Sequence, residues 1–176
     1  MKLSDFDFDL PNSLIAQNPI EKRTDSRLLV VEEDFINATF SQLDEFLKPK
    51  DLLILNDTKV IPARLFGRKE SGGKVEILVE RLINDFEALV MIKASRAPKI
   101  GSYIVLENDK QMEVLDKASG LYKLSLGSNS ILTLLNEIGH VPLPPYIERI
   151  DGKEDLVRYQ TIFAKNEGAV AAPTAG

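Results

Sequence analysis

The chain has 176 residues and a formal net charge of −5, and 44% of its residues are hydrophobic, which is enough for the core of one large domain or two modest ones. It contains no cysteine and one histidine, His140, so disulfides and thiolate metal sites are excluded and a transition-metal site is disfavoured. The negative charge argues against nonspecific nucleic-acid binding, although local basic patches can still contact phosphates.

The N-terminal stretch, residues 1–17, carries acids where a signal peptide would need a basic start and an unbroken apolar run. No window of the sequence reaches the length of a membrane-spanning helix. We therefore expect a cytoplasmic protein that makes no contact with a membrane.

Residues 1–62 mix predicted helices with predicted strands. The run RLLVVE, 27–32, is typical of a strand. Ser41 is a candidate cap for a helix over 42–47. LLILN, 52–56, is continuously apolar, which predicts a buried strand that ends in a turn. This segment is expected to be the first part of an α/β domain.

From residue 63 to about residue 127 the sequence changes to short strand candidates at nearly even spacing, separated by turns rich in Gly, Asn and Asp. Five or six such strands predict a small antiparallel barrel or sandwich. The first two are predicted to form a hairpin with its loop at 70–73.

Apolar residues over 131–138 recur at helical spacing, with Asn129 or Ser130 as cap and Gly139 as the stop. A proline-rich extended segment follows. After residue 150 the sequence again has the pattern of an α/β domain. The predicted fold class is therefore α/β plus all-β: an α/β domain in two pieces, 1–62 and 150–176, with a small antiparallel β-barrel, 63–149, inserted between them. With so few strands available, that α/β domain is expected to be incomplete.

Three motifs carry candidate chemistry, and the first is NDTKVIPARLFG, 56–67, which follows the predicted buried strand. Loops at the carboxyl ends of strands are where α/β proteins place ligand groups. Asp57 could act as a base, Lys59 could hold an anion and Arg64 could pair with a carboxylate or phosphate. The structural alternative is a turn whose Asn and Asp serve local hydrogen bonds.

The second motif, GHVPLPPYIER, 139–149, contains the only histidine. His140 could transfer a proton near neutral pH. The alternative is a histidine at a helix end beside a rigid connector, and this structural interpretation is favoured at this point.

The third motif, 158–176, joins an aromatic, a carboxamide, a hydroxyl and a cation to a run of small residues. Tyr159 and Gln160 could bind the polar edges of a base, and the small residues would let backbone amides approach a ligand. A helix followed by a tail is the alternative. The phosphate-loop, dinucleotide, nucleophile-elbow and zinc-protease motifs are all missing from the sequence, so those classes lack support.

Four sequence blocks in order resemble the S-adenosylmethionine:tRNA ribosyltransferase-isomerase family of queuosine biosynthesis. They are FDFDLPNSLIAQNP with SRLLVV, LNDTKVIPARLFGRKESGGKVEILV, GHVPLPPYIER and RYQTIFAKNEGAVAAPTAG. The resemblance runs from Asp5 to Gly176.

The resemblance implies that the ribosyl part of S-adenosylmethionine is transferred and isomerised onto 7-aminomethyl-7-deazaguanine in the tRNA anticodon, giving epoxyqueuosine, adenine and methionine. It implies an α/β domain with an inserted barrel, tRNA and S-adenosylmethionine as partners, no metal, no cofactor beyond the donor, and a monomer when full length.

Residue chemistry then suggests roles within that reaction. Asp57 is the predicted base or orienting group, and Lys59 and Arg64 would steer the donor carboxylate or an RNA phosphate. The predicted site consists of catalytic Asp57 and Lys59 and substrate-binding Arg64, Tyr159, Gln160, Thr174 and Gly176.

Family members are expected to be roughly twice as long, so the chain is interpreted as an N-terminal fragment that is cut within a ligand-approach loop. The alternative function is a noncatalytic RNA-binding module whose β unit presents Arg64, Arg68 and Lys74 to phosphates. A third possibility is a protein-interaction domain that needs a second chain to complete its sheet.

Overall fold

The structure is a computed structural model that describes residues 1–173. It divides into two units, each with its own internal contacts. The first unit consists of residues 1–54 and 145–149, and the second consists of residues 55–144 and the chain from residue 150 onward. In the described part of the chain, no helix is both long and apolar enough to cross a membrane.

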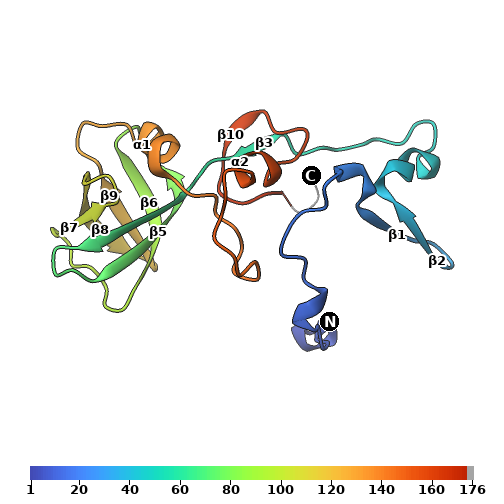
Figure 1. The fold of residues 1–176 in the computed structure, drawn as a ribbon, viewed down its shortest axis with the longest axis horizontal. Helices are drawn as coiled ribbons and strands as arrows, with labels where there is room; N and C mark the ends of the chain where they lie inside the picture. The colour runs from blue at the N-terminus through green and yellow to red at the C-terminus, as the bar shows by residue number, and fades with distance from the viewer. Residues whose placement is uncertain (174–176) are drawn as a thin grey trace. The chain divides into compact units, whose positions relative to one another are not determined.

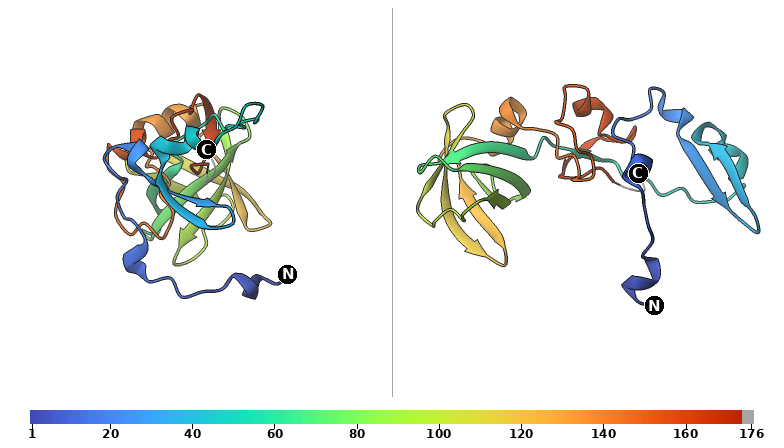
Figure 2. Two further views of the ribbon diagram at one scale, coloured as in Figure 1. Left: turned by 90° about the vertical axis from the view of Figure 1, so that its right-hand side faces the viewer. Right: turned by 60° about the horizontal axis from the view of Figure 1, so that its bottom comes forward.

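The second unit contains a closed barrel of six antiparallel strands in the order β4-β5-β6-β9-β8-β7 (Figure 1). The strands are β4 (Arg64–Lys69), β5 (Lys74–Leu82), β6 (Glu87–Ala94), β7 (Tyr103–Leu106), β8 (Gln111–Ala118) and β9 (Leu121–Ser125). The right-hand view of Figure 2 shows the same strands from another direction. The predicted barrel is confirmed, and so is the hairpin loop between β4 and β5.

Alternation of side chains along each strand produces the barrel core. On β5, Val75, Ile77 and Val79 are almost completely buried, while the residues between them are partly exposed. This is the period of two that sends successive side chains to opposite faces of a sheet. Because a closed barrel has no free edge, its strands satisfy one another's backbone groups.

Helix α1 (Ile131–Ile138) packs on the barrel and confirms the helix predicted for this segment. Its side chains Ile131, Leu134 and Leu135 join the hydrophobic core of the barrel. The Ser130 hydroxyl caps the helix by accepting a hydrogen bond from the Thr133 amide. The predicted cap residue is thus confirmed as one of the two candidates.

A short parallel sheet supplies the α/β part of the second unit. Strand β3 (Thr58–Val60) pairs with β10 (Asn166–Ala169), and helix α2 (Asp155–Arg158) precedes β10 in the chain. The Gln160 carboxamide brackets Val60, donating to its carbonyl oxygen and accepting from its amide, each at 2.8 Å. Together with the barrel, this parallel pair confirms the mixed α/β and all-β fold class.

The first unit is built from short elements. Strand β1 (Arg27–Val31) forms an antiparallel pair with β2 (Phe35–Thr39). The 3-10 helices are η1 (Leu3–Phe6), η2 (Asn12–Leu14), η3 (Arg23–Asp25) and η4 (Phe40–Phe46).

The helix predicted over 42–47 begins two residues earlier and is a 3-10 helix, η4. Its cap is Thr39 rather than Ser41, because the Gln42 side chain accepts a hydrogen bond from the Thr39 amide and completes a capping box. The prediction recognised a hydroxyl cap but missed the reciprocal contact that selects which hydroxyl is used.

The strand predicted over 52–56 is wrong. The segment is extended without strand pairing to any described residue, and the side chains of Leu52 and Ile54 are 84% and 81% exposed. An apolar run indicates that a segment favours burial, but a strand also needs a neighbour that accepts and donates backbone hydrogen bonds.

Gln17 joins two distant parts of the first unit. Its Nε2 donates to the Tyr146 carbonyl oxygen at 3.0 Å, and its Oε1 accepts from the Glu148 amide at 2.7 Å. We expect Gln17→Ala to lower the free energy of unfolding of this unit by about 1–2 kcal/mol, because two backbone groups lose their partners.

The measurement for Gln17→Ala is amide hydrogen exchange, in which the Glu148 amide should lose protection. Asn18→Ala is the control, because Asn18 is an exposed neighbouring carboxamide. Unchanged protection at Glu148 would show that the Gln17 contact is not stably formed.

Candidate functional site

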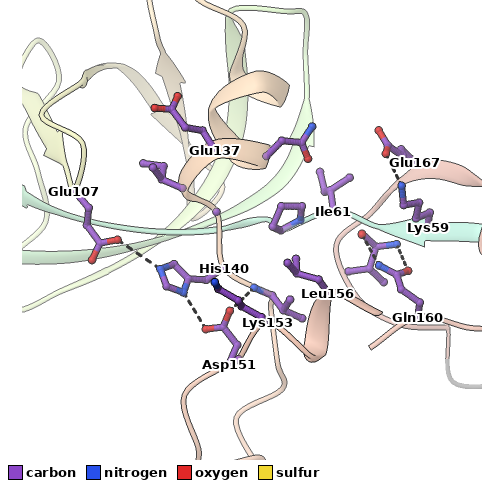
Figure 3. Close-up of a pocket in the computed structure, with 17 residues that line it drawn as sticks. Lys59, Ile61, Glu107, Glu137, His140, Asp151, Lys153, Leu156, Gln160 and Glu167 are labelled. Carbon is purple, nitrogen blue, oxygen red and sulfur yellow. Dashed lines mark hydrogen bonds and ion pairs between the residues drawn. The ribbon is translucent and has the colours of Figure 1, made fainter. Parts of the chain in front are cut away.

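An open cleft of about 660 Å³ lies in the second unit, where the end of α1 meets β3 and the segment around α2 (Figure 3). Its lining consists of residues 59–62, 136–141 and 151–153, with Glu107, Leu156, Gln160 and Glu167. A volume of this size suits a nucleoside-sized ligand. The cleft collects residues from all three of the motifs that the sequence indicated.

The backbone places His140 at one side of this cleft. The chain leaves α1 at Gly139, and His140 then exchanges two backbone hydrogen bonds with Arg64 of β4, at 2.8 and 3.1 Å. Gly139 packs so closely that a Cβ atom there would meet the carbonyl oxygens of Pro62 and Leu135. The position of His140 is therefore set by the barrel and not by a free loop.

The His140 side chain lies between two carboxylates (Figure 3). Its Nδ1 is 2.9 Å from Oδ1 of Asp151, and its Nε2 is 3.5 Å from Oε2 of Glu107. The other oxygen of Asp151 accepts a hydrogen bond from the Val141 amide at 2.9 Å. The Phe66 ring contacts the imidazole edge to face, with ring centroids 4.9 Å apart.

Lys59 and Gln160 lie on another side of the cleft (Figure 3). The Lys59 ammonium is 2.8 Å from a carboxylate oxygen of Glu167 on the neighbouring strand β10. Because both side chains are over 40% exposed, this ion pair is accessible to solvent and to a ligand.

Acidic side chains outnumber basic ones around the cleft. The carboxylates are Glu107, Glu137, Asp151 and Glu167, and the lysines are Lys59 and Lys153. An excess of negative charge around a cleft favours cationic ligands. Among residues 1–173, no group of three or more His, Cys, Asp or Glu has the arrangement of a metal site.

Comparison with known proteins gives the family. The model of a family described as queuosine biosynthesis protein matches residues 3–176. The chain belongs to this family. The resemblance stated from the four sequence blocks is thereby confirmed.

Curated relatives of this family member carry the name S-adenosylmethionine:tRNA ribosyltransferase-isomerase. The protein from Vesicomyosocius okutanii is 60% identical over 176 residues, which cover 100% of this chain and 52% of the relative. The protein from Legionella pneumophila strain Corby is 52% identical over 179 residues, covering 100% of this chain and 53% of the relative. The chain spans about half the length of the curated relatives it matches.

The chain is also similar to a solved structure, S-adenosylmethionine tRNA ribosyltransferase from Thermotoga maritima. The matched region covers 82% of this chain and 53% of the Thermotoga chain. The sequence identity is 32% and the TM-score is 0.39.

The structure brings two of the predicted site residues, Lys59 and Gln160, to the cleft of this family member. Asp57 lies before β3 outside the cleft lining, where its Oδ2 accepts a hydrogen bond from the Asn166 side chain at 2.8 Å. Tyr159 follows α2 directly. Thr174 and Gly176 lie outside the described residues.

Arg64 is engaged within the protein. Its Nη2 donates to the Leu143 carbonyl oxygen at 2.8 Å, and its Nε is 3.1 Å from a carboxylate oxygen of Glu76. The side chain is 21% exposed. These contacts stabilise the strip after α1, so Arg64 is less available to external phosphates than its sequence motif suggests.

Sequence reasoning missed Asp151 and Glu107 as neighbours of the histidine. Asp151 is 11 residues from His140 and Glu107 is 33 residues away in a turn between barrel strands. The available signal was a single histidine that is followed by a proline-rich segment and then by an acidic residue. This pattern does not predict how close the acidic side chain lies to the imidazole.

Glu137, on the cleft rim, provides a pH-dependent contact. The hydrogen bond from Lys110, and then that from Asn108, hold the pKa of this exposed carboxyl below its ordinary value of 4.5. Because the folded-state pKa is lowered, the stabilisation is present above the ordinary value and is lost as pH falls through the folded value. We expect the difference in Tm between wild type and Glu137→Gln to be largest at neutral pH and to vanish in acid.

Carbon-detected NMR titration of the Glu137 carboxyl checks the cause. In Lys110→Met its pKa should rise toward the ordinary value. Lys153→Met, which removes another lysine of the cleft lining, should leave the pKa of Glu137 unchanged. An unmoved titration in Lys110→Met would contradict the assigned cause.

Proposed function

We propose that this chain takes part in transfer and isomerisation of the ribosyl moiety of S-adenosylmethionine onto 7-aminomethyl-7-deazaguanine in the tRNA anticodon, which yields epoxyqueuosine, adenine and methionine. The observation that carries this proposal is the 60% identity, over the whole chain, to a relative named S-adenosylmethionine:tRNA ribosyltransferase-isomerase. The partners in this proposal are tRNA and S-adenosylmethionine.

The cleft supports the proposal through its charge and size. The donor carries a sulfonium cation, and the acceptor carries an amine that is protonated near neutral pH. A cleft of about 660 Å³ with an excess of carboxylates favours both groups. Lys59, whose ion pair with Glu167 is solvent-accessible, is placed to receive the donor carboxylate.

The remaining predicted residues receive more modest roles in this proposal. Gln160 holds β3 through its contacts with Val60, which positions Lys59 one residue earlier. Asp57 orders the neighbouring turn through Asn166. Tyr159 is a candidate for base recognition, since it follows α2 and is half-buried.

We also propose that residues 1–62 and 150–176 are two pieces of one α/β domain, with 63–149 inserted. The parallel pairing of β3 with β10 supports this division. It pairs residues 58–60 with residues 166–169, and all six barrel strands lie between these two segments in the sequence. We further propose that the full-length protein is a cytoplasmic monomer that needs no cofactor beyond its ribosyl donor.

Release of adenine tests the function. The product of the complete reading frame, and separately the 176-residue chain, would be incubated with S-adenosylmethionine and tRNA carrying 7-aminomethyl-7-deazaguanine. We expect adenine and epoxyqueuosine in equal amounts from the complete product. The control is tRNA with guanine at the same position, which offers no aminomethyl group. Absence of adenine from the complete product with the modified tRNA would refute the proposal.

A further inference from the structure

We propose that His140 is the group that accepts a proton in this reaction and that Asp151 is the positioning residue that orients its imidazole. The inference rests on the proposed function and assigns a role that the sequence motifs alone did not favour.

The Asp151 carboxylate is held in one orientation. One oxygen accepts from the Val141 amide and the other lies 2.9 Å from His140 Nδ1, and the side chain is only 12% exposed. A carboxylate at this distance selects the tautomer in which Nδ1 carries the hydrogen. The lone pair of the neutral ring is then on Nε2.

The ring is preorganised as well as oriented. The backbone of His140 is bonded to Arg64 on the barrel, and the Phe66 ring restricts the imidazole from one side. At 30% exposure the His140 side chain is supported by protein and still reachable from the cleft. Such support reduces the cost of bringing a base to a reacting atom.

A carboxylate faces each nitrogen of the ring. Glu107 lies 3.5 Å from Nε2, which is longer than the usual hydrogen-bond distance, and its side chain is 54% exposed. Nε2 therefore remains open to a ligand, and an imidazolium would have a carboxylate near each nitrogen. The Arg64 guanidinium donates to the Leu143 carbonyl oxygen and lies within ion-pair distance of Glu76, and Lys153 lines the same cleft.

The proton to be accepted is the one on the ribosyl carbon bonded to the sulfonium. The C–H bond breaks, its electron pair stays on the carbon next to the positive sulfur, and Nε2 gains the proton. Adenine, as it leaves, takes up a proton, so the imidazolium can return to its neutral form. No oxidant or reductant is required.

The experiment is a pH profile of single-turnover adenine release by the complete reading-frame product. We expect His140→Gln to slow the reaction by about 10²–10⁴-fold and to abolish the acidic limb of the profile. Asp151→Asn should slow it less, because the base is present but less well oriented. Glu33→Gln, which alters an exposed loop carboxylate in the first unit, is the control and should retain wild-type rates.

A second variant separates chemistry from folding. In His140→Ala, added imidazole should restore part of the rate, and the restoration should increase with the concentration of neutral imidazole as pH rises. Thermal unfolding of each variant, followed by circular dichroism, checks the fold. Wild-type rates and an unchanged acidic limb in His140→Gln would overturn the inference, whereas an inactive wild-type protein would refute the proposed function itself.

The orientation can be tested independently of activity. Because His140 is the only histidine, ¹⁵N chemical shifts of the labelled 176-residue chain report one ring. The neutral ring should carry its hydrogen on Nδ1, and Asp151→Ala should move the hydrogen to Nε2. A wild-type ring with its hydrogen on Nε2 would contradict the role given to Asp151.

Discussion

Gly139→Ala is expected to lower the free energy of unfolding by about 3 kcal/mol. The backbone at Gly139 has ordinary angles, φ −72° and ψ 149°, so the restriction is one of space. An added methyl group would overlap the carbonyl oxygens of Pro62 and Leu135, and both belong to backbone that cannot rotate away. Relief of this overlap would also move His140, which follows Gly139 directly.

Urea-induced unfolding followed by circular dichroism measures the effect of Gly139→Ala. Gly152→Ala is the matched control, because a Cβ atom there would approach only the Asp155 carboxylate, at 4.0 Å. We expect that variant to unfold within about 0.5 kcal/mol of wild type. Equal stability of the two variants would show that the turn after α1 can shift without cost.

Leu124→Ala should destabilise the barrel by about 2–5 kcal/mol, because it leaves a cavity in a closed interior that can collapse only partially. Leu124 is fully buried on β9, where its register partners are Ala88 on β6 and Val114 on β8. Both neighbouring strands would therefore lose contacts at the same level of the core.

Thermal unfolding measures this loss. Met91→Ala on β6 is the control, since its side chain is 46% exposed and its removal leaves no enclosed cavity. We expect the Met91 variant to unfold close to the wild-type temperature. A Leu124 variant as stable as the Met91 variant would contradict the burial assigned to β9.

The barrel could be predicted from the sequence because its signals are local. Alternating side chains mark each strand, and Gly, Asn or Asp mark the turns between them. Each of the six strands therefore pairs in the sheet with at least one strand that is next to it in the chain. Helix α1 was predictable for the same reason, since its cap, apolar stripe and stop all lie within ten residues.

The candidate site could be predicted only in part. Lys59 and Gln160 were chosen for their chemistry and do line the cleft. These two residues lie close together because β3 pairs in parallel with β10. The two strands are more than 100 residues apart in the sequence, so no local sequence pattern predicts their pairing. The strand predicted over 52–56 was wrong because composition alone does not make a strand. The segment has the apolar composition of a strand, but strand formation also requires a pairing partner that can be distant in the sequence.

Composition and spacing by themselves determined the barrel and its helix, and the resemblance of four sequence blocks gave the family to which the chain belongs. Only the tertiary structure decided that His140, Asp151 and Glu107 meet at one cleft and that Arg64 is engaged by Glu76. The physical reason is that side-chain periodicity records which face of an element is buried, whereas the distance between two functional groups depends on how the elements pack.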